Sequence, residues 1–407
     1  MTKTLKNISF FSLFALILVM AVATVVDKVF GTETALISIY NAWWFVALWG
    51  ICVIFAVIYA VRSDLRKNLV AAIVHFAFVL ILAGAFVSFL TSQRGFVHLR
   101  QGEILNYYLI PEKDGGTVRE ALPFNVKLLM FSKTPLVLSD IEGVRADDGK
   151  ANRGDRQKGS FFSYLQIDGN TCCVWLNHIY KYKNYRFYQY EYDSDERGVT
   201  LLVNRDPAGI AITYAGYLLL LVSGLWLLFV KLPFKGTVLL TAVTAVVWLF
   251  ISQIKPMTPV LRSPMLAAHV SVIMVSYAIL LIIAVLSAIY LVRESINRRQ
   301  PSAENRNSNI ERLTSTLLFP AVFLLAFGIF IGAVWANVSW GRYWGWDSKE
   351  TWALITLLVY AIPFHKRAFP KFRDAKFLHR YLLVAFLSVL MTFLGVSFLL
   401  GGLHSYL

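Results

Sequence analysis

Histidine is the residue type in this chain best suited to metal chemistry, because a neutral imidazole nitrogen is a good axial ligand for iron. The sequence holds seven histidines, and four of them lie in or beside long apolar runs: His75, His269, His365 and His404. A polar ring at membrane depth is costly and is usually kept for a ligand or a partner. Two such histidines on different helices could clamp a flat macrocycle, although a hydrogen-bonded packing role is equally compatible with each one alone.

A second chemical signal is the tryptophan-rich segment 335–352, WANVSWGRYWGWDSKETW. It holds Tyr343 and five tryptophans, Trp335, Trp340, Trp344, Trp346 and Trp352. An interfacial belt of amphipathic rings explains two or three of them. It does not explain the glycines and polar residues between the rings, among them Asp347 and Glu350. We interpret the segment as a shelf for a planar, dianionic molecule such as haem, with Arg342 or Lys349 neutralising the propionates.

The elements that must position these residues are membrane helices. The chain has 407 residues, is 57% hydrophobic and only 15% charged, and has a mean hydropathy of +0.60, which is too apolar for a soluble protein of this length. Because a span needs roughly 20 apolar residues, we predict about nine spans, of which the eighth is the weakest. They lie near 8–27, 42–61, 70–90, 208–230, 236–254, 266–292, 314–336, 348–364 and 381–401. The first run lacks a small-residue cleavage signature after it and is interpreted as a retained anchor.

The net charge of +15 reports membrane orientation and not nucleic-acid binding. Loops that alternate along the predicted spans lie on the same side of the membrane. The loops on one side, including the charged linker 293–313, hold 18 Lys and Arg, whereas the short loops on the other side hold five. The positive-inside rule then predicts a cytoplasmic N-terminus. Nine spans place the C-terminus and the large loop 92–207 outside, in the periplasm if the membrane is a bacterial inner membrane.

This orientation sorts the four membrane histidines into two pairs. His75 and His365 fall near the cytoplasmic face, and His269 and His404 fall near the outer face. Pairing by depth favours the ligand interpretation, most strongly for the outer pair. A solvated surface position is favoured for His98, His178 and His379.

The segment 92–207 is predicted to fold as an antiparallel β-rich domain, because apolar and polar residues alternate around the turn signal DGN at 168–170. The stretch 145–160 is a polar loop. The three cysteines, Cys52, Cys172 and Cys173, form no CxxC, CxxCH or zinc-type spacing. The chain is therefore expected neither to relay disulfides nor to carry covalent haem itself.

The segment from WANVSW to HKR, with PMLAAHVSVIMVSYAILL before it and GGLHSYL at the end, closely resembles the tryptophan-rich haem-handling proteins of the CcsA/ResC family. These proteins belong to the System II pathway of cytochrome c maturation. The earlier part, with VHFAFVLILAGAF and RFYQYEYDSDERGVTLLVNRDPAG, resembles their CcsB/ResB partner, so the chain resembles a natural fusion. The parts would be 1–91 with three spans, the outer domain 92–207, a fourth span at 208–234, and a five-span haem-handling domain at 235–407.

The resemblance implies a cytochrome c synthase, a lyase-type enzyme that conducts haem b outward and attaches it to the CxxCH motif of an apocytochrome c. It places His269 and His404 at an external haem as axial and catalytic ligands, His75 and His365 at an inner haem site, and the five tryptophans with Asp347 around the cofactor. Apocytochrome c, a thiol-reducing protein and membrane lipid are the implied partners. The outer domain is shorter than in many fused members.

Two other functions use the same residues. A b-type di-haem electron-transfer protein would need four histidine ligands, but such proteins usually carry two of them on one helix. A transporter or scaffold for another amphiphile would use the tryptophans as a lipid-facing belt. The absorption spectrum of the purified protein separates the last function from the others.

Overall fold

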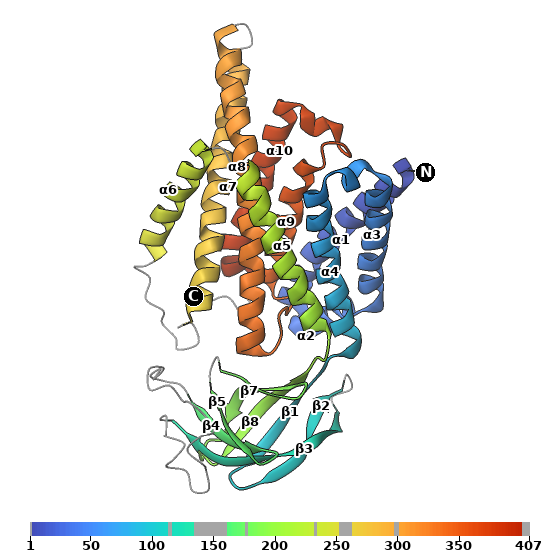
Figure 1. The fold of residues 1–407 in the computed structure, drawn as a ribbon, viewed down its shortest axis with the longest axis vertical. Helices are drawn as coiled ribbons and strands as arrows, with labels where there is room; N and C mark the ends of the chain where they lie inside the picture. The colour runs from blue at the N-terminus through green and yellow to red at the C-terminus, as the bar shows by residue number, and fades with distance from the viewer. Residues whose placement is uncertain are drawn as a thin grey trace.

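The computed structural model describes residues 2–112, 116–133, 161–175, 178–231, 234–251, 263–296 and 301–400. It shows a bundle of long helices with a β domain at one end (Figure 1). This arrangement confirms the prediction of a polytopic helical membrane protein with a β-rich extramembrane domain. In chain order the helices are α1 (Thr2–Phe30), α2 (Thr32–Ala35), α3 (Trp43–Arg62), α4 (Leu69–Thr91), α5 (Gly209–Lys231), α6 (Phe234–Ile251), α7 (Pro264–Ile296), α8 (Pro301–Trp340), α9 (Ser348–Ala361) and α10 (Ala375–Leu390), the last continued by a π-helix at Met391–Leu400.

Seven helices among the described residues are long and apolar enough to cross a membrane, and they match seven of the nine predicted runs. The other two runs correspond to α6 and α9. With 14 residues, α9 is about 21 Å long, short of a hydrocarbon core of about 30 Å, and a 3₁₀ turn at Ile362–Phe364 extends it. The eighth run, the weakest in the sequence, thus corresponds to a helix too short to cross the hydrocarbon core by itself.

The prediction of a linker at 293–313 is wrong for most of that segment. α7 continues to Ile296 and α8 begins at Pro301, so both helices extend beyond their apolar runs. Glu and Arg are good helix formers, and apolar periodicity reveals only the membrane-embedded part of such a helix.

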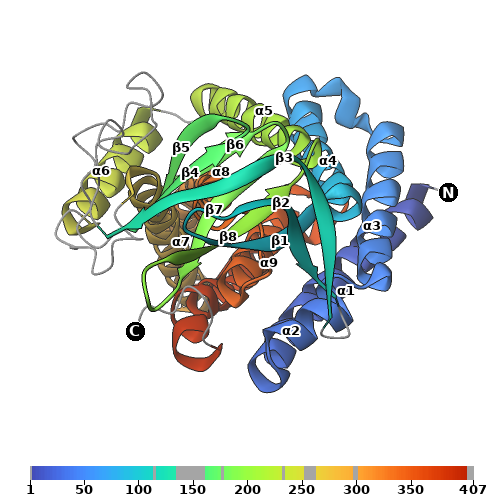
Figure 2. The same ribbon diagram turned by 90° about the horizontal axis from the view of Figure 1, so that it is seen from below.

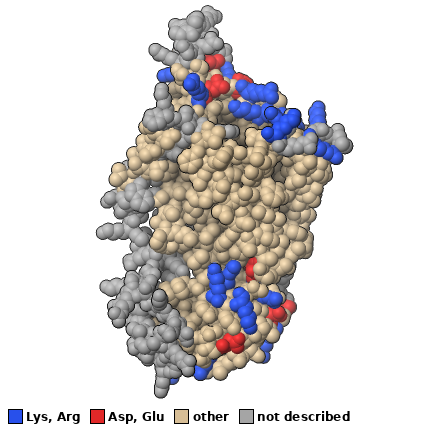
Figure 3. All heavy atoms as spheres, viewed as in Figure 1, with Lys and Arg blue, Asp and Glu red and all other residues tan. Residues whose placement is uncertain are grey.

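The helices bury two apolar clusters and leave an apolar outer surface. The larger cluster lies where α7, α8, α9 and α10 pack together, around Leu280, Leu325, Tyr360 and Leu382. The second joins α1 and α3 to α9. Figure 3 shows a wide band without Lys, Arg, Asp or Glu between two charged ends, and basic residues gather at the end away from the β domain. This band has the character of a lipid-facing surface.

The β domain is one antiparallel sheet in the order β5-β4-β3-β2-β1-β8-β7-β6, and it lies across the end of the helical bundle (Figure 2). Its strands are β1 (Gln93–Arg100), β2 (Ile104–Pro111), β3 (Thr117–Ser132), β4 (Phe162–Ile167), β5 (Asn170–Trp175), β6 (Tyr180–Tyr182), β7 (Tyr185–Tyr192) and β8 (Gly198–Arg205). The predicted turn is present, because Asp168 and Gly169 both have positive φ and join β4 to β5. The predicted polar loop 145–160 lies outside the described residues.

The cysteines of the described chain are free thiols. Cys172 and Cys173 are neighbours on β5, and burial raises the pKa of both, that of Cys173 to about 12. A thiol with a raised pKa is a poor nucleophile near neutral pH. That the chain does not relay disulfides stays a prediction.

Membrane orientation is a testable prediction. Reporter fusions after Lys67 and Arg373 should report the cytoplasm, and fusions after Asn170 and Leu407 the outer side, because the basic loops stay inside. The measurement is the activity of a reporter that works only on one side. An outer signal after Arg373 together with a cytoplasmic signal after Leu407 would show that the short α9 does not complete a crossing.

Candidate haem-binding site

The tryptophan-rich segment 335–352 covers the end of α8, the residues 341–347 between the helices, and the start of α9. This tryptophan-rich connection lies against the β domain. Trp340 ends α8, and Asp347 is the residue before α9. From the sheet, Arg94 donates from Nη2 to the carbonyl of Trp340 (3.4 Å), and Asn204 donates from Nδ2 to the carbonyl of Gly341. The connection is therefore held between the two parts of the molecule.

Local hydrogen bonds fix the shape of this connection. Asp347 accepts from the N–H of Lys349 (2.9 Å), and Glu350 reaches back in a capping box. Glu350 also accepts from the N–H of Gly345 (2.8 Å). Trp346 has φ of 56°, a conformation that costs a residue with a Cβ of order 1 kcal/mol or more. The described contacts of Asp347 thus position the tryptophans, while its predicted contact with the cofactor stays a prediction.

The five tryptophans fall into two ring groups and one hydrogen-bonded anchor. Trp346 stacks on Tyr40 with centroids 4.6 Å apart and an interplanar angle of 9°, and Trp344 meets Trp346 edge-on at 5.7 Å. Trp335 and Trp340 form the other group, with centroids 4.9 Å apart. Trp352 instead donates from Nε1 to Thr24 (3.1 Å).

Two of these tryptophans have an unmet hydrogen-bond donor. The Nε1 atoms of Trp335 and Trp344 are buried and have no hydrogen-bond partner in the described structure. A buried donor without an acceptor is unfavourable. The sites around these two rings are therefore suited to a ligand that brings hydrogen-bond acceptors.

Tyr40 is a part of the site that the sequence analysis missed. It is the last residue of the π-helix Leu36–Tyr40, which joins α2 to the start of α3. Tyr40 is only 3% exposed and supplies the plane on which Trp346 stacks. Its hydroxyl lies 3.4 Å from that of Thr351. Trp43, Trp44 and Trp49 follow Tyr40 in the sequence, but only the fold shows that Tyr40 itself stacks on Trp346.

His269 lies on α7 near the end that faces the β domain. Its Nδ1 is 2.7 Å from the carbonyl oxygen of Gly328 on α8. A carbonyl oxygen can only accept, so Nδ1 carries the proton and Nε2 of the neutral ring carries the lone pair. This backbone bond is the usual way to orient a metal-binding histidine.

A glycine on α8 makes room for this imidazole. A Cβ added at Gly332 would lie 2.6 Å from the ring of His269, so a larger residue would displace it. Trp335 follows three residues later, one turn along the same face of α8. The ring of His269 therefore lies beside the tryptophan-rich segment. Its role as a ligand at an external site stays a prediction, and His404 lies outside the described residues.

The inner histidines come together although they are 290 residues apart in the sequence. The ring centroids of His75 on α4 and His365 after α9 are 5.9 Å apart, and the planes are nearly perpendicular at 87°. Imidazole binds transition metals at about 2.0–2.1 Å, so two rings on opposite sides of one metal have centroids about 6 Å apart. The pair has the spacing of two axial ligands.

Both inner rings are oriented by their own helix. The Nδ1 of His75 bonds the carbonyl of Ala71 (2.7 Å), and the Nδ1 of His365 bonds that of Ala361 (3.0 Å). Each ring therefore has its Nε2 lone pair available in the neutral form. His75 precedes Thr91, the last residue of α4, by 16 residues, or about 24 Å of helix, which places the pair far from the β domain.

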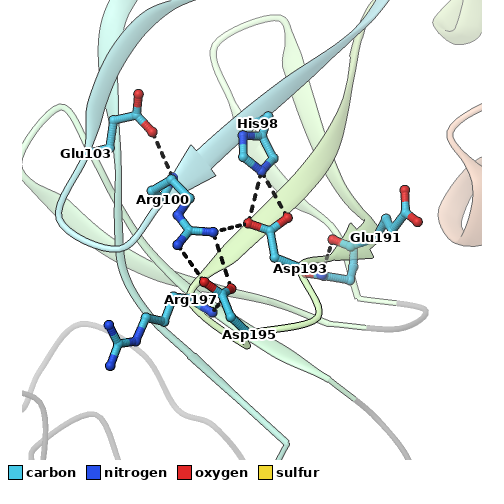
Figure 4. Close-up of polar contacts among 8 residues, drawn as sticks. His98, Arg100, Glu103, Glu191, Asp193, Asp195 and Arg197 are labelled. Carbon is cyan, nitrogen blue, oxygen red and sulfur yellow. Dashed lines mark hydrogen bonds and ion pairs between the residues drawn. The ribbon is translucent and has the colours of Figure 1, made fainter.

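The other histidines have different surroundings. His98 is a surface residue, as predicted, in a network with Asp193, Arg100 and Asp195 (Figure 4). His178 is also exposed and stacks on Trp175 at 3.5 Å. His379 corrects the prediction of a surface position, because it is fully buried on α10 and stacks on Tyr290 at 4.1 Å. The sequence suggested a basic loop there, but α10 begins at Ala375 and turns this ring inward.

Among the described residues, no group of three or more His, Cys, Asp or Glu forms a metal site. Axial ligation of a macrocyclic iron needs only one or two protein ligands. The paired and singly placed histidines fit that requirement.

The tryptophan groups make a quantitative prediction. Trp344→Ala should weaken haem retention about tenfold, since burying one large apolar side chain contributes about 1.5–3 kcal/mol. Trp44→Ala is the matched control, because this ring is 50% exposed on α3 and should have little effect. Retention is measured as the Soret absorbance per mole of purified protein. Equal mild losses of haem in both variants would contradict the interpretation of the tryptophans as a shelf for haem.

Fold and site together define a class of protein: a polytopic membrane protein with two histidines facing each other between its helices and a tryptophan-rich connection facing an extramembrane β domain. Comparisons with known proteins agree with this class. The model of the cytochrome C assembly protein family matches residues 210–404, and the model of the ResB-like family matches residues 55–209. The chain therefore joins a ResB-like part and a cytochrome C assembly part in one polypeptide.

Similar curated proteins carry related names. Cytochrome c biogenesis protein CcsA of Chlamydomonas reinhardtii is 40% identical over 155 residues, which is 38% of this chain and 44% of that protein. Protein NrfI of Wolinella succinogenes is 40% identical over 159 residues, 38% of this chain and 17% of that protein. CcsA of Guillardia theta is 38% identical over 172 residues, 37% of this chain and 56% of that protein. The chain thus spans about half the length of the CcsA relatives and less of NrfI.

Proposed function

We propose that the protein is a cytochrome c synthase that conducts haem b across the bacterial inner membrane and attaches it to apocytochrome c on the outer side. The observation that carries the proposal is the pair His75 and His365, whose centroids are 5.9 Å apart. A further histidine, His269, is held by the carbonyl of Gly328 and lies beside the tryptophan-rich connection. The matches to the cytochrome C assembly and ResB-like family models support a role in cytochrome c maturation.

In this proposal haem is the substrate. The inner pair receives it, and the outer site, made of His269, His404 and the tryptophans, holds it for reaction. Each S–H of the CxxCH motif adds across a vinyl C=C of the haem, so that sulfur bonds one carbon and hydrogen the other. No oxidant is consumed, but both thiols must arrive reduced and the iron ferrous. A separate thiol-reducing protein supplies the first condition.

The residues of this chain act mainly by positioning. His269 fixes the iron, the tryptophans fix the plane of the macrocycle, and the capped loop around Asp347 holds those rings in place. Fixing both reactants lowers the entropic barrier of the addition. The histidine of the CxxCH motif then displaces one protein ligand, which allows the product to leave.

The test uses the full-length protein in detergent. We expect a Soret band on purification, and after reduction we expect transfer of haem to a CxxCH peptide, detected as a peptide mass increased by one haem. An AxxAH peptide is the control and should gain no covalent haem. A protein without any Soret band would favour a scaffold for another amphiphile. A stable Soret band with no transfer, but with electron transfer to an outer acceptor, would favour the b-type di-haem alternative.

A further inference from the structure

Three arginines meet where the β sheet touches the tryptophan-rich connection. Arg94 on β1 and Arg186 on β7 are each paired with Asn204 on the strand between them, β8. Directly paired residues project from the same face of a sheet. Since Asn204 donates to the carbonyl of Gly341, this face is turned toward the connection.

Arg342 is the third arginine, and the connection itself supplies it. A Cβ added at Gly345 would lie 3.0 Å from the guanidinium carbon of Arg342, so this group lies flat on the backbone of Gly345. Burial, and next the positive charge of Arg342, lower the pKa of Arg94 to about 10. Arg94 also donates to the carbonyl of Trp340, two residues before Arg342 in the chain, so both arginines lie at this contact between the sheet and the connection.

The polar groups around these arginines are incompletely bonded. Two of their buried donors have no hydrogen-bond partner in the described structure: Nε of Arg94 and Nη1 of Arg186. Tyr188 is only 2% exposed, and the charges of Arg186 and Arg94 both act on it. Unmet buried donors and clustered like charges are unfavourable unless an anion joins them.

No carboxylate within the described ranges plays that role. None of the three arginines forms an ion pair there with Asp or Glu. Asp206, the acid nearest to the connection from the sheet side, accepts from Ser88 and from the N–H of Gly209. Glu350 accepts from the N–H groups of Gly345 and Asp347. Lys349, the other cation considered for the propionates, donates to Ser397 (2.9 Å).

We infer that Arg94 and Arg186 of the outer domain, together with Arg342, form a carboxylate-binding site for the propionates of the haem held by the tryptophan-rich connection. The inference rests on the proposed function. Guanidinium groups bind carboxylates through two parallel hydrogen bonds, and a haem brings two carboxylates. The β domain is then part of the haem site, and haem links the domain to the membrane helices.

The experiment compares haem with its dimethyl ester, which keeps the macrocycle and iron but lacks both carboxylates. The variants are Arg94→Gln, Arg186→Gln and the double variant in the full-length protein, with Arg119→Gln, an exposed arginine of β3, as the matched control. The measurement is the rate at which purified protein releases each macrocycle to an excess of a haem-scavenging apoprotein. A charge-assisted hydrogen bond contributes enough for about a tenfold change per arginine.

We expect the double variant to release haem about 100-fold faster than the wild type, and the wild type to release the ester faster than haem. In the double variant only Arg342 remains, so its release rates for haem and ester should differ much less than those of the wild type, and Arg119→Gln should behave as the wild type. A variant that merely fails to fold would lose the ester as well, relative to the wild type.

Three outcomes overturn the inference. If the wild type retains haem and ester equally well, the site does not bind propionates, although the proposed function stands. Unchanged haem release in the double variant, combined with a higher peptide concentration for half-maximal attachment, would assign the arginines to a carboxylate of the arriving polypeptide. A wild type that binds neither macrocycle would instead refute the proposed function itself.

Discussion

His269→Ala is expected to abolish cytochrome c assembly while the protein still inserts into the membrane. Loss of an outer-shell partner of a metal ligand costs about 10–100-fold, so loss of the ligand itself should reduce covalent attachment by more than about 100-fold. Added imidazole should restore part of the activity, because it can occupy the vacated position on the iron. The measurements are covalently bound haem in the cytochrome and the Soret spectrum of the purified variant with and without imidazole.

Two controls separate ligation from packing around His269. His98→Ala removes an imidazole from the surface of the β domain, where its side chain is 48% exposed, and should leave assembly unchanged. Gly332→Ala crowds the ring of His269 without removing it, so it should impair assembly in a way that imidazole does not rescue. Normal assembly by His269→Ala, or equal rescue of both variants, would contradict an axial role. His404→Ala is expected to behave as His269→Ala does.

Much of the fold follows from physical patterns in the sequence. Long apolar runs predict membrane helices because the lipid interior demands them, and seven of the nine predicted runs coincide with described helices of sufficient length. Alternation and the DGN turn predict the antiparallel sheet. The ends of α7 and α8 could not be predicted in this way, since charged helical turns in water carry no apolar signal.

Some residues of the candidate site can likewise be predicted from local sequence signals, and others cannot. Histidines at membrane depth and a dense cluster of tryptophans are local signals, so the sequence reveals His75, His269, His365 and the connection between α8 and α9. The stacking of Tyr40 on Trp346 depends on the packing of distant elements.

The register between strands cannot be predicted from such local signals either. Only the pairing of β1, β8 and β7 places Arg94 and Arg186 beside Asn204. The fully buried His379 shows the opposite error, because neighbouring lysines and arginines in the sequence do not report which face of a helix a ring occupies.

The inner histidines give the second large prediction. His75→Ala and His365→Ala should each deplete haem from the outer site about as strongly as the double variant does. If the two rings bind one metal, removing either breaks the pair, and the second substitution adds little. We expect each variant to retain less than about a tenth of the wild-type haem. Haem supplied from the outer side should restore attachment, because the outer ligands are intact.

Phe76→Ala is the matched control for this prediction, since Phe76 is next to His75 on α4 but is 58% exposed toward lipid. It should leave haem content unchanged. Additive losses in the double variant would show that the two rings bind separate partners. A defect in attachment that persists when the outer site is filled with ferrous haem would assign His75 and His365 to folding or to the reaction itself. Only depletion that outer haem bypasses supports conduction, because the two pairs are predicted at opposite faces of a core about 30 Å thick and one haem cannot contact both.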